Sequence, residues 1–252
     1  MPAALYHQIT TLANQNQKQV AVLVDPDKVT LQDLEKIITL VHLNGVNYIF
    51  VGGSLITGGF LDECIRFFKG STSVPVVLFP GNALQIHPLA DGILLLSLIS
   101  GRNPELLIGS HVVAAPALKQ SGLEIMPTGY MLVESGKLTS VVYMSNTTPI
   151  PSDKPDIATS TAMAGEMLGM KLIYLDAGSG AARPVPQEMI LEVKKSIGIP
   201  LIVGGGIRCT ASARTAWNAG ADIVVVGNAL ENDPEFIEQL CLERNRINQV
   251  KV

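Results

Sequence analysis

Three glycine-rich segments of the sequence each follow a short apolar run. They read "YLDAGSGA" at 174–181, "IVGGGIR" at 202–208 and "VVVGNAL" at 224–230. Glycine tolerates positive φ angles and lets the backbone approach a ligand closely, so successive N–H groups can converge on phosphate oxygens. The pattern predicts a phosphate site at Gly205, Gly206, Gly227 and Asn228, with tight turns that bind nothing as the alternative.

The first of these segments also carries side chains that suit chemistry. Tyr174 and Asp176 are two residues apart in a strand-like run, so they share one face of that strand. If that face is the mouth of a binding site, both side chains reach the ligand. The amides and hydroxyl of Gly178, Ser179 and Gly180 suit the rest of a small phosphorylated polyol.

A second group of oxygen ligands follows the first two apolar runs of the chain. Asp25 in "LVDPDK" precedes proline, which holds its carboxylate rigidly, and Ser54 in "FVGGSLITGG" adds a hydroxyl. Mg²⁺ takes one or two carboxylates and completes its shell with water and substrate phosphates. The two residues are therefore candidate Mg²⁺ ligands, although their types are also common in caps and turns. Asp27 and Lys28 lie in the same loop as Asp25.

The remaining reactive side chains show no pattern of a site. The three cysteines are far apart and lack CxxC spacing, and the four histidines lack ligand spacing, so we interpret both sets as structural or surface residues. They are Cys64, Cys209 and Cys241, and His7, His42, His87 and His111. The net charge of −4 comes without a block of Lys or Arg, which argues against nucleic-acid binding.

Short β-branched runs alternate with longer amphipathic segments along the chain. This alternation is typical of βαβ units. We expect eight strands, at 20–24, 48–52, 74–79, 92–97 and 123–133 and in runs that begin at 171, 199 and 221. Helices are expected at 30–43, 60–69, 104–119, 157–168, 187–197, 210–218 and 233–245, the last with Asp233 as its N-cap and Pro234 at its first position.

Eight parallel strands with helical returns indicate a (β/α)₈ TIM barrel, with an open doubly wound sheet as the alternative. Only "PGNALQIHPLAD" separates the third and fourth strands, so one crossover helix is replaced by a loop. The segment 133–156 reads as an excursion after the fifth strand. We expect a single domain over residues 1–252, since barrels of this size fold as one unit.

The composition is apolar for a protein without a membrane span. Hydrophobic residues make up 47% of the chain and charged residues 16%, which suits a sheet buried on both faces and leaves apolar surface for a greasy ligand or a partner subunit. No apolar run approaches the roughly 18 residues that a span requires, and the N-terminus lacks the pattern of a secretory signal. A cytoplasmic protein is expected.

Taken in order, several segments between residues 20 and 231 resemble the geranylgeranylglyceryl phosphate synthase family, which includes the bacterial PcrB-type heptaprenylglyceryl phosphate synthases. The phosphate loops occur in many barrels, but "PTGY", "NTTPIP" and "YLDAGSG" are more specific. The likeness is closer to the geranylgeranyl branch, because "AGSGA" and the "PIP" excursion follow its pattern. The other matching segments are "VDPDK", "FVGGS" and "LFPGN".

The resemblance implies a prenyltransferase. Such an enzyme joins the 3-hydroxyl of sn-glycerol 1-phosphate to C1 of a long prenyl diphosphate, most closely geranylgeranyl diphosphate, and releases pyrophosphate. Position by position, Asp25 and Ser54 match the family's Mg²⁺ ligands. The glycerol-phosphate contacts match Tyr174, Leu175, Asp176, Ala177, Gly178, Ser179, Gly180, Gly205, Gly206, Gly227 and Asn228. The resemblance also implies a homo-oligomer, a dimer or hexamer, and transient membrane contact when the lipid product leaves.

Two positions depart from the family's pattern. The family typically carries Glu where this chain has Asp176, so the arm of the expected catalytic base is shorter by one methylene. The PcrB branch typically has Lys two positions before the first-strand Asp, where this chain has Leu23, which weakens the heptaprenyl alternative. Segments 94–99 and 114–118 are candidates for the floor of the prenyl channel.

Two further functions remain open from the sequence. A phosphosugar isomerase shares the final phosphate loops, but such enzymes generally use a carboxylate pair at the ends of strands one and five, and "PTGYMLVE" has no acid at the expected mouth near 128–130. The other alternative is a non-catalytic homologue that binds phosphate. The reason to consider it is that Asp176 replaces the family's typical Glu.

Overall fold

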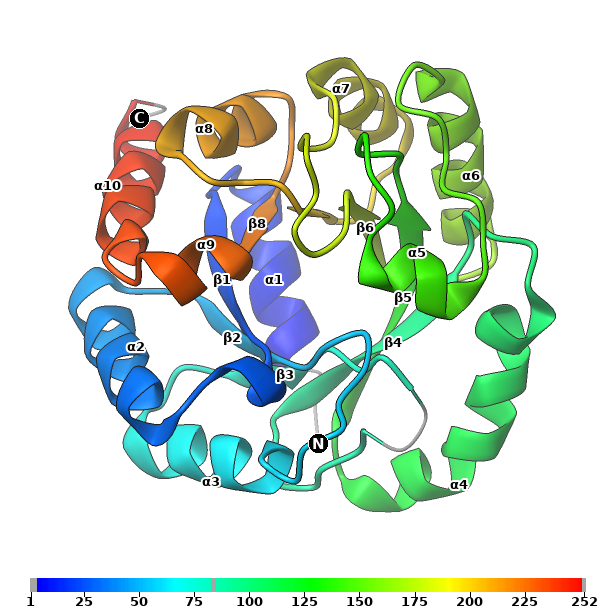
Figure 1. The fold of residues 1–252 in the computed structure, drawn as a ribbon. Coiled ribbons are helices and arrows are strands. Elements are labelled where there is room, and N and C mark those ends of the chain that lie inside the picture. Colours follow the sequence, from blue (N-terminus) through cyan, green and yellow to red (C-terminus); the bar gives the residue numbers. More distant parts are fainter. Residues whose placement is uncertain (1–3, 83–84, 251–252) are drawn as a thin grey trace.

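Eight parallel strands form a closed barrel in the computed structural model, which describes residues 4–82 and 85–250 (Figure 1). Each strand pairs with its neighbours in chain order, and β1 closes the ring against β8. The predicted barrel is therefore confirmed, and the alternative of an open, doubly wound sheet is excluded. The strands are β1 Gln19–Val24, β2 Tyr48–Val51, β3 Val76–Leu78, β4 Gly92–Leu98, β5 Glu124–Leu132, β6 Leu172–Asp176, β7 Leu201–Gly204 and β8 Ile223–Val226.

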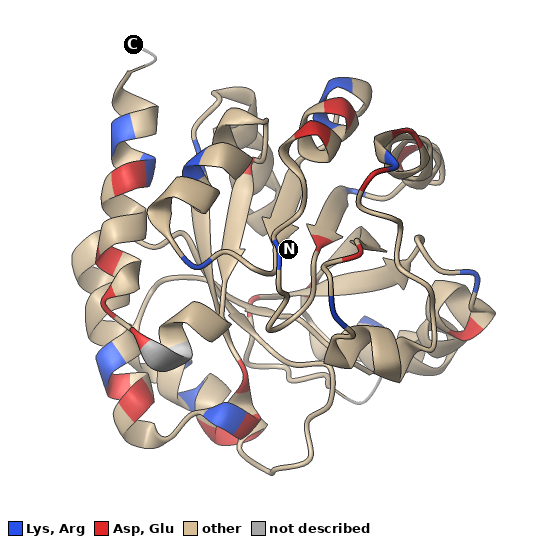
Figure 2. Cartoon of the chain, turned by 45° about the horizontal axis from the view of Figure 1, so that its top comes forward, with Lys and Arg blue, Asp and Glu red and all other residues tan. Residues whose placement is uncertain are grey.

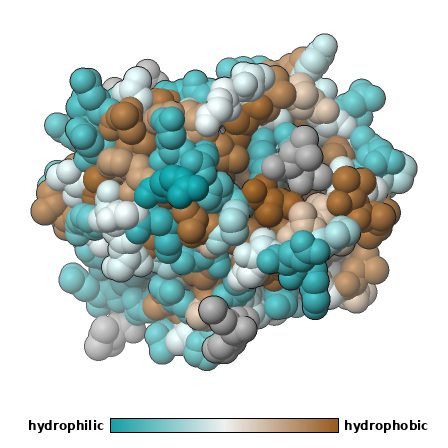
Figure 3. All heavy atoms as spheres, turned by 90° about the horizontal axis from the view of Figure 1, so that it is seen from below, coloured by the Kyte–Doolittle hydropathy of each residue, from teal (hydrophilic) through white to brown (hydrophobic). Residues whose placement is uncertain are grey.

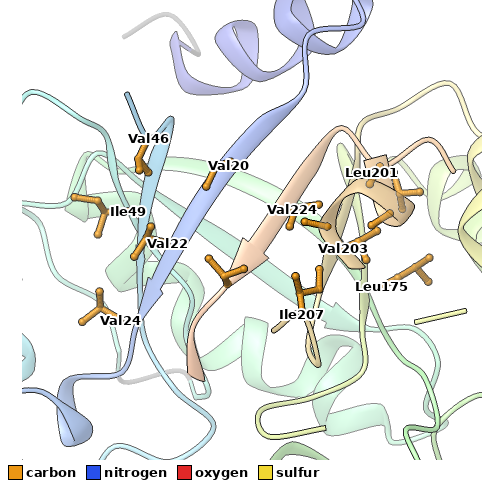
Figure 4. Close-up of a cluster of buried hydrophobic side chains, with 14 of the residues drawn as sticks. Val20, Val22, Val24, Val46, Ile49, Leu175, Leu201, Val203, Ile207 and Val224 are labelled. Atoms are coloured by element: carbon orange, nitrogen blue, oxygen red, sulfur yellow. The ribbon is translucent and has the colours of Figure 1, made fainter. Parts of the chain in front are cut away.

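Side chains alternate between two apolar layers because successive residues of a strand point to opposite faces. Val20, Val22 and Val24 of β1 lie on one side of the strand, in the layer between the barrel and its helices (Figure 4). Ala21 and Leu23 belong to the layer inside the barrel. Both faces of the sheet are therefore buried, which explains the β-branched runs.

Helices cover the barrel between most strands, close to the expected positions. They are α2 Leu31–Asn44, α3 Leu61–Ser71, α4 Ser110–Ser121 preceded by a π-helical turn at Glu105–Gly109, α6 Pro155–Met167, α7 Gln187–Ser196, α8 Thr210–Asn218 and α10 Phe236–Gln249. The predicted cap at Asp233 and Pro234 is wrong. The short helix α9, Asn228–Asn232, takes up the chain first, and the Asp233 carbonyl accepts a turn bond from the Phe236 amide, so α10 begins later.

Besides α9, two further helices were missed by the sequence patterns. The first, α1 (Ala4–Asn14), closes the barrel end opposite the loops that follow the strands. Its Leu5 and Ile9 join the inner apolar layer, and the Glu124 carboxylate accepts the Leu5 and Tyr6 amides, both at 2.8 Å. The second, α5 (Ser140–Ser145), is only 6 residues long and lies within the excursion after β5.

The connection from β3 to β4 contains no helix in the part that the structure describes, residues 79–82 and 85–91. This agrees with the short, Pro- and Gly-rich segment in the sequence. On this side of the barrel the π-helical turn Glu105–Gly109 packs on β4, where the Ser97 hydroxyl donates to the Leu107 carbonyl at 3.4 Å, and α4 follows it. The site described below uses that gap.

Charged residues lie mainly on the helices and loops, with both signs interspersed (Figure 2). None of the helices in the described part of the chain has the length and apolarity to span a membrane.

An ion pair holds the start of two neighbouring strands together on the α1 side of the barrel. Asp222, just before β8, accepts the Lys194 ammonium at 2.7 Å and the Leu201 amide at the start of β7 at 2.8 Å. Asp222 is buried and Lys194 only partly exposed. The same arrangement recurs four strands earlier, before β4, with Asp91, Lys69 and Val76.

We expect Asp222→Ala to lower the free energy of unfolding by about 3 kcal/mol, because it leaves a buried amide and a partly buried ammonium without their acceptor. Urea and thermal unfolding measure the change. Glu192→Ala is the matched control, since it breaks an exposed pair with Lys195 and should have a much smaller effect. Equal losses in the two variants would contradict this role for Asp222.

Candidate active site

A polar cavity opens where the strands end, on the face of the barrel opposite α1. The loops after β1, β2, β6, β7 and β8 form most of its wall. Of the residues predicted from the sequence, it is lined by Asp25, Ser54, Tyr174, Asp176, Ser179, Gly180, Gly205, Gly206, Gly227 and Asn228. The structure therefore brings the candidate metal ligands and the candidate phosphate loops into one cavity.

Three predicted contacts lie behind this wall. Leu175 points into the outer apolar layer, as the strand alternation requires. Ala177 donates its amide to the Gly204 carbonyl at 3.1 Å, and the Gly178 amide is taken by Asp176. These three residues shape the loop after β6 but do not line the cavity.

The Asp176 carboxylate lies at the bottom of the cavity and is 6% exposed. Its Oδ1 accepts the Gly178 amide at 2.7 Å, and its Oδ2 accepts the Tyr130 hydroxyl. Tyr130 comes from β5, where it stands beside Tyr174 of β6 in the strand register. Each carboxylate oxygen keeps a lone pair for a ligand, because an ionised carboxylate has about four acceptor positions.

Burial dominates the electrostatics of this carboxylate. Burial raises the pKa of Asp176, while the hydrogen bonds from Tyr130 and Gly178 act in the opposite direction. Burial and the nearby Asp176 charge also raise the pKa of the Tyr130 hydroxyl well above its usual range. At neutral pH Tyr130 is thus a hydrogen-bond donor and not a competing base.

The glycines at the ends of β6 and β7 are required by both conformation and space. Gly178, Gly205 and Gly206 have φ angles of 90°, 78° and 71°, in the left-handed region that favours glycine. A Cβ at Gly205 would lie 2.6 Å from both Asp176 Oδ1 and the Gly178 amide nitrogen. The backbone of the β7 loop therefore packs directly on the carboxylate, which no other residue type would allow.

The loops after β6 and β8 are joined by Asn228. Its Oδ1 accepts the Ser179 hydroxyl at 2.7 Å and the Gly180 amide at 2.8 Å. Arg208 crosses the same loop from the other side and donates to the Ala181 carbonyl at 2.5 Å. Arg208 also lines the cavity and places a positive charge beside the predicted phosphate site. Sequence reasoning missed it, although it lies only two residues after the last of the three glycines.

Asp25 and Ser54 form the opposite wall of the cavity. Asp25 packs against the backbone of the β2 loop, where a Cβ at Gly53 would lie 3.0 Å from its Oδ1. Lys28 approaches Asp25 Oδ2 at 3.3 Å. Within the described residues there is no cluster of three His, Cys, Asp or Glu side chains that could hold a metal. One carboxylate and one hydroxyl are hard oxygen donors, a set that fits Mg²⁺ when substrate phosphates and water supply the other ligands.

A second, apolar groove adjoins the polar cavity. It runs between the outer face of β4 and α4, in the gap left by the missing crossover helix. Its volume, about 260 Å³, exceeds the 180 Å³ of the polar cavity. Figure 3 looks onto the face formed by α3 and α4 and shows hydrophobic residues reaching the surface there. The groove is lined mainly by Ile86, Ile93, Leu95, Leu96, Leu98, Leu106, His111, Ala114, Leu118 and Met144.

The two spaces share one wall, formed by Gly53, Ser54, Leu55, Phe79, Tyr130 and Val141. Aromatic rings form the core of this junction. The ring centroid of Tyr174 lies 5.4 Å from those of both Phe79 and Tyr130, stacked on the first and edge-on to the second. Sequence analysis assigned no role to Phe79 or Tyr130, although both stand at strand ends within motifs that carry the family resemblance.

The chain is similar to proteins of one family over most of its length. A model of the PcrB family matches residues 13–243. Geranylgeranylglyceryl phosphate synthase of Chitinophaga pinensis is 54% identical over 223 residues, 88% of this chain and 88% of that protein. The synthase of the same name from Spirosoma linguale is 53% identical over 233 residues, 92% of this chain and 94% of the relative.

A solved structure shows the same fold with a ligand. The crystal structure of (S)-3-O-geranylgeranylglyceryl phosphate synthase from Thermoplasma acidophilum, in complex with its substrate sn-glycerol-1-phosphate, matches this chain with a TM-score of 0.89 and 32% identity. The match covers 96% of this chain and 98% of that one.

The buried carboxylate predicts a specific pH dependence of stability. Because the folded-state pKa of Asp176 is raised, its ionisation destabilises the fold, and wild type loses this increment of stability as the pH rises from about 4 through the folded pKa. Asp176→Asn does not ionise. We expect the melting temperature of the variant, relative to that of wild type, to rise with pH over this range. Above the folded pKa the difference should no longer change.

Thermal melts of the two proteins between pH 4 and 8 test this expectation. Tyr130→Phe serves as the comparison, because loss of its hydrogen bond removes an effect that lowers the pKa of Asp176 and should shift the transition to higher pH. A difference in melting temperature between Asp176→Asn and wild type that is the same at every pH would show that Asp176 does not titrate in this range.

Proposed function

The chain belongs to the PcrB family, and we propose that it is a prenyltransferase that joins the 3-hydroxyl of sn-glycerol 1-phosphate to a long-chain prenyl diphosphate. The observation that carries the proposal is the shared wall between a polar cavity with phosphate loops and an apolar groove. A reaction between a phosphorylated polyol and a lipid diphosphate needs these two spaces side by side. The names of the relatives support geranylgeranyl diphosphate as the prenyl donor.

The loops after β6, β7 and β8 bind glycerol phosphate in this proposal. Amides of Gly205 and Gly206 and of Gly227 and Asn228 converge on the phosphate, with the Arg208 guanidinium adding positive potential. The name of the Thermoplasma acidophilum complex, with sn-glycerol-1-phosphate as substrate, supports this choice of ligand. The preference for this enantiomer over the sn-3 form rests on the same relatives.

Asp176 is the proposed base. The oxygen of the 3-hydroxyl forms the new bond to C1 of the prenyl chain, the bond from C1 to the diphosphate breaks, and the hydroxyl proton passes to the Asp176 carboxylate. Tyr130 and Gly178 hold that carboxylate in place. The arm is one methylene shorter than that of the family's Glu, and the β7 loop packs directly on its carboxylate at Gly205.

The diphosphate lies at the opposite wall in this proposal. Mg²⁺ bound by Asp25 and Ser54 would neutralise the charge of the leaving group. Lys28, whose ammonium lies 3.3 Å from Asp25 Oδ2, adds a second positive charge at the wall where the diphosphate is proposed to bind. The rings of Phe79 and Tyr130 line both spaces and the ring of Tyr174 lines the polar cavity, so in this proposal they surround the allylic C1, where positive charge would develop.

The apolar groove receives the prenyl tail. Part of each predicted floor segment lines it, namely Leu95, Leu96 and Leu98 of 94–99 and Ala114 and Leu118 of 114–118, so in this proposal these side chains set the prenyl length that fits. A heptaprenyl donor, the alternative, would need a longer channel.

A phosphosugar isomerase would need a carboxylate at the end of strand five, facing the cavity. Asp25 and Asp176 are the acidic residues among those lining the polar cavity. Glu134, which follows β5, is partly exposed and bonds with Ser152 and Arg183 instead. A carboxylate pair at the ends of strands one and five is therefore not formed by the described residues.

We also propose a homo-oligomer and transient contact with a membrane during product release. Exposed hydrophobic side chains beside the groove support this proposal, because monomeric proteins rarely expose such groups together. They are Ile108, Val112 and Val113 on and before α4, and Tyr143 and Met144 on α5.

The first experiment is a turnover assay with labelled sn-glycerol 1-phosphate and geranylgeranyl diphosphate, with and without Mg²⁺. We expect the ether product from wild type only with Mg²⁺. The turnover rate of Asp176→Asn should be lower by about 10²- to 10⁴-fold, the usual contribution of a general base. Its affinity for glycerol phosphate, measured by calorimetry, should stay close to that of wild type.

The sn-3 enantiomer is the substrate control, and product from it at the same rate would contradict the proposed specificity. Wild type that binds glycerol phosphate but forms no product with any donor would favour the non-catalytic alternative. Normal turnover by Asp176→Asn would remove Asp176 from the role of base.

The groove predicts a change in donor preference. Ala114 is buried on α4 and lines the groove, so Ala114→Phe fills part of the channel. We expect a higher KM for geranylgeranyl diphosphate and a smaller change for shorter prenyl donors. Val113→Phe is the matched control, because the neighbouring Val113 is 72% exposed and should tolerate the same ring. Equal effects of the two substitutions would place the tail elsewhere.

A further inference from the structure

Asp27 has no role in the function proposed so far, yet its carboxylate is fully engaged. It follows β1 in the short 3₁₀ turn Pro26–Lys28, two residues after Asp25. Its Oδ2 accepts the Thr57 amide at 2.6 Å and the Thr57 hydroxyl at 3.0 Å, and its Oδ1 accepts the Gly58 amide at 3.0 Å. Three bonds to one exposed carboxylate connect the β1 loop to the loop between β2 and α3.

The chain at residue 58 is adapted to this contact. A Cβ at Gly58 would lie 2.9 Å from Asp27 Oδ1, closer than side chains pack, so glycine allows the carboxylate to reach the backbone. Gly59, the next residue, has nothing within 4 Å of the equivalent position. The two glycines therefore differ in what they do, although they are adjacent in the sequence.

The β2 loop is held against the β1 loop at two points. At one end Gly53 packs on the Asp25 carboxylate, and at the other end Thr57 and Gly58 bind Asp27. Between these points lie Ser54 and Leu55, which line both the polar cavity and the apolar groove. The position of the shared wall thus depends on both aspartates.

We infer that Asp27 is a positioning residue for the prenyl diphosphate. By holding the loop that carries Ser54 and Leu55, it sets the affinity for the diphosphate and its divalent cation. It leaves the glycerol phosphate side unaffected, because the carboxylate hydrogen-bonds with Thr57 and Gly58 of the β2 loop and, among the described residues, with none of the loops after β6, β7 and β8. The inference rests on the proposed function for the identity of the ligand.

Binding of pyrophosphate with Mg²⁺, measured by calorimetry, tests the inference without turnover. An amide has one acceptor oxygen in place of two, so Asp27→Asn should weaken binding about tenfold, roughly the effect of one hydrogen bond to a charged group. Gly58→Ala should act in the same direction by pushing the carboxylate away, whereas Gly59→Ala should bind like wild type. Affinity for sn-glycerol 1-phosphate should change less than about twofold in all three variants.

Hydrogen exchange of the Thr57 and Gly58 amides in the ligand-free proteins gives a second readout. It should accelerate in Asp27→Asn and Gly58→Ala, with melting temperatures unchanged. Faster exchange with unchanged pyrophosphate affinity would overturn the inference, as would an equal loss of glycerol phosphate affinity or a wild type that does not bind pyrophosphate. If wild type binds pyrophosphate but makes no ether product, the proposed function fails, and weaker pyrophosphate binding by Asp27→Asn and Gly58→Ala still supports the role of Asp27.

Discussion

A carboxylate that must stay able to ionise inside a buried site is the constraint on which the active site depends. Water is largely excluded from Asp176, so its charged form is stabilised by the Tyr130 hydroxyl and the Gly178 amide. These partners come from neighbouring strand ends. The close approach of the β7 loop at Gly205 and the left-handed turn at Gly178 follow from this crowding.

The barrel separates two tasks around that carboxylate. Loops after β6, β7 and β8 have the glycines and the Arg208 cation that suit a phosphate, and Asn228 joins two of these loops. Loops after β1 and β2 have Asp25 and Ser54, joined through Asp27. Each half is therefore stiffened by side-chain bonds between its own loops, and in the proposed reaction the two substrates approach Asp176 from these two halves.

The connection between β3 and β4, which has no helix in its described residues, leaves room for the apolar groove. In a barrel with all its crossover helices, the outer face of β4 would be packed on both sides and no groove would reach the catalytic mouth. Here the short connection leaves that face to α4, and the groove meets the polar cavity at Phe79, directly after β3. The rings of Phe79, Tyr130 and Tyr174 pack on one another at this junction, with centroid distances of 5.4 to 5.9 Å.

The sequence by itself determined the strands, the barrel and the places of most site residues, because these depend on local features. Period-two apolar runs define strands, and parallel strands bring the segments that follow them, such as Gly205 and Gly227, to one face. Only the tertiary structure decided which partners meet. Tyr130 and Asp176 are 46 residues apart, and Asp27 lies 30 residues from Thr57, so no local pattern predicts either contact. The start of α10 was misplaced for the same reason, since α9 forms where the β8 loop closes the cavity and leaves Asp233 in a turn. Side-chain contacts of this kind are set by the packing of distant elements, and a single sequence carries that information only through the completed fold.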